Sequence, residues 1–272
     1  MRYKNKMCTS FMINSPKTII GMNYDGTDEI KIMLKEDNQF LILLKVHGQF
    51  FHSFGINKSG IFMNTLMVTP NEQGKYRRGK NVIHMMKFFE HVMGETVKFQ
   101  DLEGFLQTNT IVNVPNFNVH SMIVGKSGDT YIVEPGISNF HNSLFSDGPV
   151  VLTNFPMCHS ICENYKEAKG TGEERYKKAY SMILEKNEAF SIEDGFAVLK
   201  ETMQLHGEYP TRFSMVSILE DEEIYFATNG DFSKVFKFTF EDKKIITHMG
   251  FEKSNSSILS KKGILVAELE NF

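Results

Sequence analysis

The sequence has no hydrophobic run long enough to cross a membrane, and its start has no sustained apolar segment of the kind found in a signal peptide. An excess of one charge is also missing, because the net charge is −3 and the isoelectric point is near 6.3. This balance gives no electrostatic reason to expect binding to nucleic acid or to an anionic membrane. We therefore expect no membrane and no nucleic acid among the partners, and a cytoplasmic location.

Cysteine is scarce, with three residues at positions 8, 158 and 162 of 272. Three thiols cannot all pair, and such sparse usage fits a reducing compartment better than a disulfide scaffold. Cys158 and Cys162 flank His159 and could form a metal or redox pair on a helix. Two thiols leave a tetrahedral zinc site incomplete, however, and no second Cys or His pair follows at zinc spacing. We expect no metal ion and no cofactor.

Other signatures are missing as well, since the chain has no phosphate-binding glycine loop and no G-x-S-x-G elbow. What remains is an ordinary globular composition, with 41% hydrophobic and 23% charged residues. The length allows one large core or two modest ones. Because no linker, repeat or low-complexity segment interrupts the chain, we expect one domain over residues 1–272.

The hydrophobic pattern alternates between sheet and helix along the chain. Period-two apolar runs predict strands and apolar residues at helical spacing predict helices, and Ser191 with Asp194 suits a helix start. The predicted strands cover 8–13, 18–25, 40–56, 60–68, 119–135, 148–156 and two or three segments of 212–240, and the predicted helices cover 81–108, 173–187 and 191–206, with one last strand possible after 253. This order favours stacked antiparallel sheets with helices outside.

The first predicted hairpin brings a thiol close to a carboxylate. If its turn centres on Ser15 and Pro16, Cys8 faces Asn23, and Asp25 lies diagonally on the same sheet face. A lone Cys in an apolar strand is usually an inert core residue. A neighbouring carboxylate would raise the pKa of the thiol, so Asp25 suits a cation instead. That cation would be the α-ammonium group of Cys8, exposed if residues 1–7 were removed, and Cys8 would then supply both nucleophile and base.

Six segments, in order, resemble the choloylglycine hydrolase and penicillin V acylase family of N-terminal nucleophile cysteine amidohydrolases. They are "MCTSF", "GMNYD", "INKSGIFMNTLMV", "VHSMIVGKSGDTYIVEP", "VVLTNFP" and "TRFSMV". Each segment is a weak signal by itself, but together they run from residue 7 to the late strands. The chain is also similar to isopenicillin N acyltransferases. The resemblance implies a four-layer αββα sandwich, in agreement with the order of elements predicted above.

The resemblance also implies roles for individual residues. Cys8 would be the nucleophile and Asp25 would bind its freed α-amine. The backbone amide of Met67 and the side chain of Asn154 would form the oxyanion hole, and Arg212 would be the active-site arginine. Residues 1–7 would be a removable propeptide, cleaved by the chain itself or by a peptidase.

Two positions depart from the family pattern. Met22 stands where the family usually has an arginine that supports the nucleophile, and Gly125 replaces a common aspartate. Met22 and its neighbour Asn23 would lie near the substrate. Without the arginine, activation of the thiol would depend on the α-amine and on Arg212.

The resemblance implies hydrolysis of the C–N bond of a linear amide through a thioester on Cys8. Bile-salt conjugates, penicillin V and N-acyl amino acids are all compatible small-molecule substrates. Two alternatives remain open: transfer of the acyl group to an amine, and a catalytically silent binding protein on the same fold. The family further implies a homo-oligomer, either a dimer or a tetramer.

Overall fold

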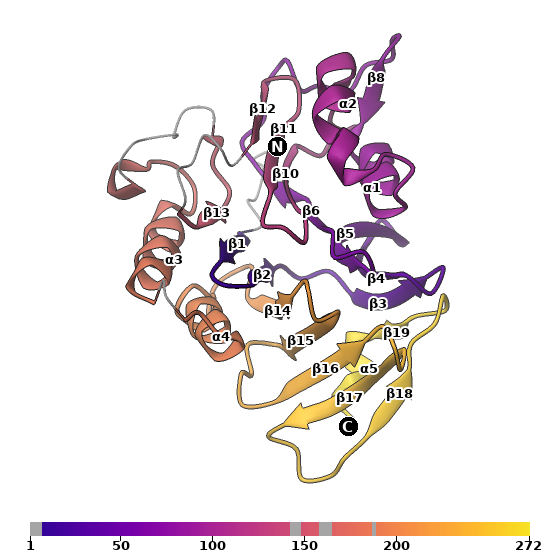
Figure 1. Ribbon diagram of the computed structural model, residues 1–272, viewed down its shortest axis with the longest axis vertical. Coiled ribbons are helices and arrows are strands. Elements are labelled where there is room, and N and C mark those ends of the chain that lie inside the picture. The colour runs from indigo at the N-terminus through magenta and orange to yellow at the C-terminus, as the bar shows by residue number, and fades with distance from the viewer. Residues whose placement is uncertain (1–6, 142–147, 158–164, 187–188) are drawn as a thin grey trace.

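The computed structural model describes residues 7–141, 148–157, 165–186 and 189–272, and it contains two large sheets of antiparallel strands (Figure 1). The first sheet has the spatial order β13 (Val150–Leu152), β1 (Thr9–Asn14), β2 (Thr18–Asp25), β14 (Thr211–Ile218), β15 (Glu223–Thr228), β16 (Val235–Thr239), β17 (Lys244–Met249) and β18 (Ser256–Ile258). The second has the order β12 (Ser138–His141), β11 (Thr130–Glu134), β10 (Val119–Val124), β6 (Phe62–Asn64), β5 (Gln49–Asn57), β4 (Gln39–Val46), β3 (Ile30–Lys35) and β19 (Ile264–Leu265).

Shorter elements complete the fold. The two-residue strand β7 (Leu66–Met67) pairs with β10, and β8 (Val82–His84) pairs in parallel with β9 (Thr110–Val112). The helices are α1 (Met85–Met93), α2 (Leu102–Thr108), α3 (Glu173–Glu185), α4 (Ile192–Glu201) and the short α5 (Val266–Leu269), with 3₁₀ turns η1 (Phe99–Asp101) and η4 (Tyr165–Glu167). No helix in the described ranges is both long and apolar enough to cross a membrane.

The alternation of side chains along β4 explains why the second sheet has an apolar layer on each face. Phe40 and Ile42 belong to the core that the sheets share, whereas Leu41 and Leu43 pack with α1. Since successive side chains of a strand point to opposite faces, one apolar strand can serve both layers. Burying each of these side chains contributes about 1.5–3 kcal/mol.

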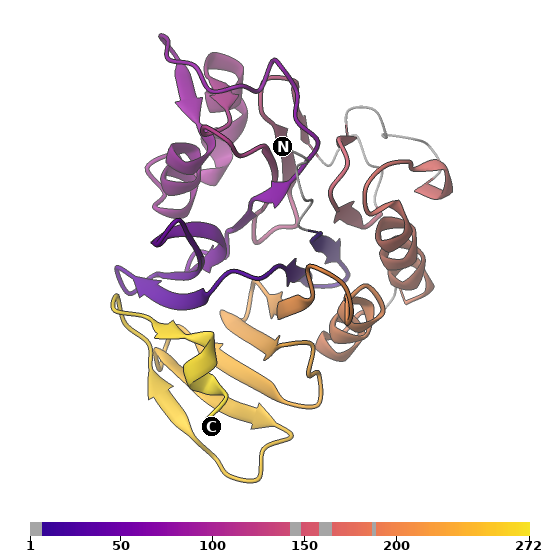
Figure 2. The ribbon, with the colours of Figure 1, turned by 180° about the vertical axis from the view of Figure 1, so that it is seen from behind.

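Helices α3 and α4 cover the outer face of the first sheet, and α1 and α2 cover the outer face of the second (Figures 1 and 2). Gly195 lets α4 approach β14 closely, because a Cβ atom at this position would lie 2.7 Å from Val216 Cγ1. The predicted start of α4 is confirmed: Ser191 Oγ accepts from Asp194 N, and Asp194 Oδ2 accepts from Ser191 N. The layers are therefore helix, sheet, sheet, helix.

Some predicted boundaries were wrong. Residues 82–84 form β8 instead of beginning a helix, because they pair with β9. The segment 60–68 is divided into β6 and β7, and β3 and β17 were missed. The last twenty residues hold β18, β19 and α5 rather than a single strand. The short strands form because they pair with strands elsewhere in the chain, and the local periodicity of a sequence contains no information on such pairing.

The predicted register of the first hairpin was also wrong, by one residue. Thr9 pairs with Asn23, because the turn contains three residues, 15–17, instead of centring on Ser15 and Pro16. A shift of one residue exchanges the two faces of a strand. Continuing the observed register places Cys8 opposite Tyr24, so the thiol shares a face with Met22 and Tyr24 instead of with Asn23 and Asp25.

Candidate active site

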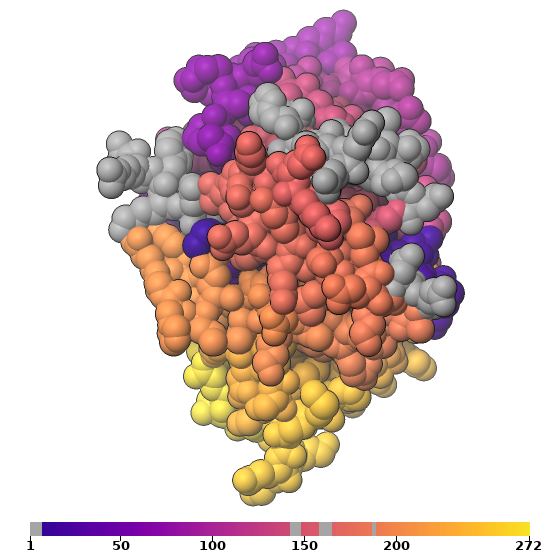
Figure 3. All heavy atoms as spheres, turned by 90° about the vertical axis from the view of Figure 1, so that its left-hand side faces the viewer, coloured from indigo at the N-terminus to yellow at the C-terminus, as the bar shows by residue number. Residues whose placement is uncertain are grey.

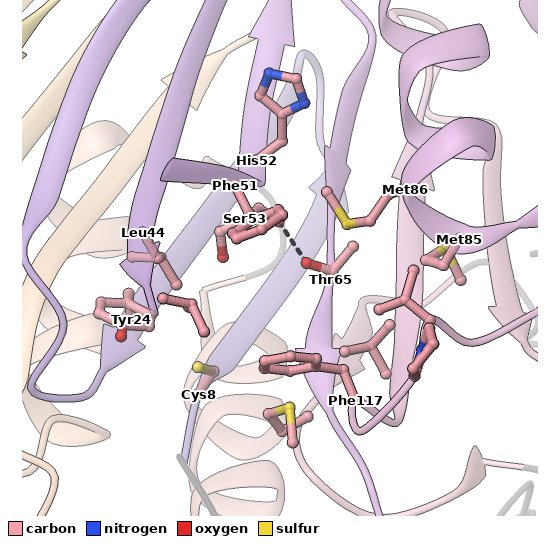
Figure 4. Close-up of a pocket in the computed structure, with 15 residues that line it drawn as sticks. Cys8, Tyr24, Leu44, Phe51, His52, Ser53, Thr65, Met85, Met86 and Phe117 are labelled. Atoms are coloured by element: carbon pink, nitrogen blue, oxygen red, sulfur yellow. Dashed lines mark hydrogen bonds between the residues drawn. The ribbon is translucent and has the colours of Figure 1, made fainter. Parts of the chain in front are cut away.

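A cavity of about 300 Å³ lies between the second sheet, α1 and the loop before β10. Its walls are mostly apolar, with Leu44, Met85 and Phe117 among the lining side chains (Figure 4). The polar lining residues are His52, Ser53 and Thr65, and burial lowers the pKa of His52 below its ordinary value. None of the described lining residues is Asp, Glu, Lys or Arg. The cavity therefore suits an uncharged apolar group.

The Cys8 side chain lies at one end of this cavity, between Tyr24 and Phe117 in Figure 4. Cys8 is 4% exposed, and it immediately precedes β1. Tyr24 is fixed by donating to Asp28 Oδ2 at 2.6 Å. Gly26 leaves room for this ring, because a Cβ atom there would lie 2.3 Å from the Tyr24 hydroxyl. A group bound in the cavity would consequently lie against the thiol.

Asn154 connects Cys8 with Met67 through both ends of its side-chain amide. The Cys8 backbone nitrogen donates to Asn154 Oδ1 at 2.8 Å, and Asn154 Nδ2 donates to the Met67 carbonyl oxygen at 2.7 Å. Met67 itself lines the cavity. Three segments far apart in the sequence thus meet at Cys8, although the catalytic roles of these residues stay predictions.

The segment that carries Asn154 is held by the second sheet. His120 of β10 contacts the Thr153 carbonyl oxygen through Nε2 at 2.7 Å and Glu134 Oε1 through Nδ1 at 3.3 Å. The same Glu134 oxygen accepts from the Met157 backbone nitrogen at 2.6 Å. The predicted hairpin that begins at His120 therefore binds the chain before Asn154, at Thr153, and after it, at Met157. These contacts fix the position of Asn154 relative to Cys8.

Arg175 of α3 reaches the same group of atoms, and the sequence analysis missed it. Its Nη1 atom donates to the Cys8 carbonyl oxygen and, at 2.8 Å, to Thr9 Oγ1, and its Nη2 atom donates to Asn154 Oδ1 at 2.9 Å. A signal was present in "GTGEER": an arginine in the first turn of a helix is disfavoured by the helix dipole. Such an arginine needs partners outside its own helix.

Asp25 lies on the opposite face of β2 from the thiol. Its carboxylate accepts from Thr211 Oγ1 at 2.6 Å and from Gln204 Nε2 at 3.0 Å. Burial raises the pKa of Asp25 to about 6, whereas the Thr211 hydrogen bond and the charge of Arg175 act to lower it. The expected contact with the nitrogen of Cys8 is replaced here by the hydrogen bond to Asn154, with Met7 still attached and that nitrogen an amide.

Asn23 and Met22 occupy structural positions. Asn23 Nδ2 donates to the Leu199 carbonyl oxygen of α4 at 2.8 Å, and its Oδ1 accepts from Ser214 at 2.7 Å. Met22 is fully buried between the sheets, with Sδ 3.9 Å from Asn64 Nδ2. Neither belongs to the described lining of the cavity. Their predicted contact with substrate stays a prediction.

Arg212 lies at a β-bulge between Thr211 and Phe213. Its Nε atom is buried and has no hydrogen-bond partner within the described ranges. It is also missing from the described lining of the cavity, where Arg175 instead contacts Cys8. The role predicted for Arg212 stays a prediction, and the observed cation beside Cys8 comes from α3.

The second cysteine group cannot be placed, because Cys158, His159 and Cys162 lie outside the described residues. Within residues 7–141, 148–157, 165–186 and 189–272, no group of three His, Cys, Asp or Glu side chains could hold a metal ion.

Two solved structures resemble this fold over most of their length. A mutant of conjugated bile acid hydrolase from Clostridium perfringens has a TM-score of 0.65 at 15% identity, covering 93% of this chain and 97% of that one. Penicillin V acylase from Agrobacterium tumefaciens has a TM-score of 0.60 at 12% identity, covering 88% of this chain and 90% of that one. The predicted fold, a four-layer αββα sandwich, is thereby confirmed.

Sequence comparison gives the family. No match was found among curated proteins. A family model described as linear amide C–N hydrolases, choloylglycine hydrolase family, matches residues 27–199, which is more than half of the chain. That range contains Met67, Asn154 and Arg175. The chain therefore belongs to the choloylglycine hydrolase family of linear amide C–N hydrolases.

Proposed function

We propose that this protein hydrolyses a linear amide with an apolar acyl group, with Cys8 as the nucleophile. The observation that carries this proposal is the position of the Cys8 thiol at the end of an apolar cavity, beside Asn154 and Met67. The acyl group would occupy the cavity and present its carbonyl carbon to the sulfur. Removal of residues 1–7, a homo-oligomeric state and a cytoplasmic location are further parts of the proposal.

The reaction would proceed in two steps. Sγ of Cys8 attacks the amide carbon, and the thiol proton passes to the α-amine of Cys8 and then to the leaving nitrogen, so that the C–N bond breaks and a thioester forms. Water, deprotonated by the same α-amine, then attacks the thioester and restores the thiol. Asn154 Nδ2 and the Met67 amide would stabilise the oxyanion in both steps.

The cavity restricts the acyl group more than the amine. An acyl group that carries a carboxylate or an ammonium would lose its hydration without gaining a partner, because the described lining has no side chain of opposite charge. The steroid acyl group of a conjugated bile acid and the phenoxyacetyl group of penicillin V are both uncharged and largely apolar, so the two structural neighbours suggest suitable classes of substrate. N-acyl amino acids with apolar acyl chains are equally suitable.

A panel of amides with one leaving amine tests this function. We expect kcat/KM to be at least ~10²-fold higher for apolar acyl groups than for matched acyl groups ending in a carboxylate, because the buried charge would be unpaired. Release of the amine is the measurement. Equal rates for the two series, or no release from any member, would contradict the proposal.

Asn154→Leu should reduce kcat by about 10²–10³-fold with KM changed much less, because a lost oxyanion donor acts mainly on the transition state. Asn109→Leu is a matched control at an asparagine outside this site, and it should leave both constants near their original values. Steady-state kinetics on the best amide of the panel gives the comparison. A variant of Asn154 with unchanged kcat would remove this side chain from the oxyanion hole.

The acyltransferase alternative uses the same thioester, with an amine in place of water as the acceptor. Adding a primary amine to the assay distinguishes them: formation of the new amide at the expense of free acid would identify a transferase. We expect the free acid to dominate in water.

A further inference from the structure

Arg175 was not assigned a role by the resemblance, yet it binds three parts of the site. Its guanidinium group joins the backbone of Cys8, the Thr9 hydroxyl group and the side chain of Asn154. A planar guanidinium is suited to such forked contacts. We infer that Arg175 is the positioning residue of this active site, where it orients Asn154 and supplies the cation that position 22 lacks.

The contacts of Asn154 fix the orientation of its side-chain amide group. Two donors, the Cys8 nitrogen at 2.8 Å and Arg175 Nη2 at 2.9 Å, converge on Oδ1. This end must accept, so the NH₂ end is directed towards Met67 and the cavity, where an oxyanion donor is needed. Without Arg175 one of the two donors that fix this orientation is lost.

Gly172 leaves open the space that the Arg175 guanidinium group occupies at the site. Gly172, which precedes α3, has φ of +85°, and a Cβ atom there would lie 2.5 Å from Arg175 Nη2. A side chain at 172 would therefore strain the backbone and displace the guanidinium group. The segments of α3 and α4 cover the outer face of the first sheet, on the side of the molecule that Figure 3 shows. Arg175 therefore approaches Cys8 from the helical layer, while the thiol faces the cavity.

Arg175 also brings a positive charge close to Cys8 and Asp25. Burial lowers the pKa of Arg175 below its ordinary value, and the negative charges of Asp25 and ionised Cys8 oppose that shift. The groups facing Asp25 are Thr211 of β14 and Gln204 after α4, both neutral, and the charged Arg175 of α3. The guanidinium group, which also donates to the Cys8 carbonyl oxygen, would therefore attract a thiolate on one side of β2 and the Asp25 carboxylate on the other.

This placement has a consequence for the proposed mechanism, on which it rests. Arg175 and the nitrogen of Cys8 share one acceptor oxygen, so the guanidinium charge would lie close to the freed α-amine. A neighbouring positive charge disfavours protonation of an amine and lowers its pKa. The α-amine would then be available as a base at a lower pH. Met22 has no charge and cannot lower the pKa of the amine in this way.

Alkylation of Cys8 tests the inference without requiring turnover. In a Cys158→Ser/Cys162→Ser background, the rate of reaction with iodoacetamide is followed by intact mass as a function of pH. We expect the midpoint to rise by about one pH unit in Arg175→Gln, because the thiolate loses a nearby cation. Lys178→Gln, an exposed site on the same helix, is the matched control and should leave the midpoint unchanged.

Kinetics supply the second readout. Arg175→Gln should lower kcat by about 10²-fold with KM within about 3-fold, as expected for a misplaced catalytic group. Arg175→Lys keeps the charge but loses the forked contacts, so its alkylation midpoint should stay near the original while kcat falls by about 10-fold. This second variant decides the question if Arg175→Gln does not fold.

An unchanged alkylation midpoint in folded Arg175→Gln, or an unchanged kcat in Arg175→Lys, would overturn the inference. Failure of the proposed amidase function would look different from failure of this inference. The unaltered protein would then show no turnover, while the alkylation profiles of the unaltered protein and Arg175→Gln could still differ.

Discussion

Cys8→Ala should abolish amide hydrolysis, with a loss of kcat of at least ~10⁴-fold, because the residual rate would come only from substrate binding and the oxyanion hole. The side chain is small and buried beside a cavity, so its truncation should leave the fold intact. Release of the amine from the best amide of the panel measures the loss. Cys8→Ser should also be inactive, since an alcohol is much harder to ionise than a thiol at neutral pH.

The other two cysteines provide the matched controls. Cys158→Ser and Cys162→Ser should keep activity within a few-fold, because the proposed mechanism uses Cys8, which has Asn154 and Met67 beside it. A further check is the trapping of acyl-enzyme: brief reaction followed by acid quench should add the mass of the acyl group to the original protein but not to Cys8→Ala. A loss at Cys158 equal to that at Cys8 would instead support a metal or redox role for that pair.

The sequence predicted the main strands well, because their signals are local. Each arm of the first hairpin has an apolar run, and the polar turn between them is clear from "NSPK". The start of α4 was predicted equally well from Ser191 and Asp194. The side chain of each residue accepts a hydrogen bond from the backbone nitrogen of the other, within four residues of the chain. Local hydrogen bonding and local periodicity are what a sequence pattern contains.

The register of that hairpin could not be predicted from the sequence. It decides which side chains share a face with Cys8. One additional residue in the turn moved Cys8 to the face of Met22 and Tyr24, and left Asp25 facing α4. Turn geometry depends on the backbone conformation of three residues, which their identities do not fix. The notion of a thiol and a carboxylate on one face was therefore wrong, although both lie near Arg175.

The place of Arg175 in the first turn of α3 is a local signal that it has partners elsewhere, but the neighbouring sequence does not say which residues they are. The segment 173–187 has the composition of a solvated helix, and the interacting atoms belong to Cys8, Thr9 and Asn154, the first of which is 167 positions away. By contrast, Met67 and Asn154 were found because each stands in a segment that resembles a family motif. Resemblance identifies positions that the family shares, whereas a cation supplied from a different element requires the fold.

Exposure of the Cys8 α-amine should decide whether the protein is active at all. In the chain with Met7 attached, the Cys8 nitrogen is an amide that donates to Asn154 Oδ1. The lone pair of an amide is delocalised into its carbonyl group, so this nitrogen cannot accept the thiol proton. A chain that retains Met7 should consequently have kcat/KM lower by about 10³-fold or more, since it lacks the general base.

Intact mass of the freshly produced protein shows first whether processing occurs, as a species that begins at Cys8. A second form, with residues 1–7 replaced by an affinity tag and a specific protease site ending before Cys8, allows activity to be measured before and after cleavage of one preparation. The same tagged chain carrying Cys8→Ala is the control, and it should be inactive in both states.

If the leader is removed by the chain itself, Cys8→Ala should also retain its leader when produced without the tag. Cleavage should raise activity in proportion to the fraction of chains that begin at Cys8, because each freed amine creates one base. A species that retains Met7 by mass and hydrolyses amides as fast as the cleaved form would show that another group, and not the α-amine, accepts the thiol proton.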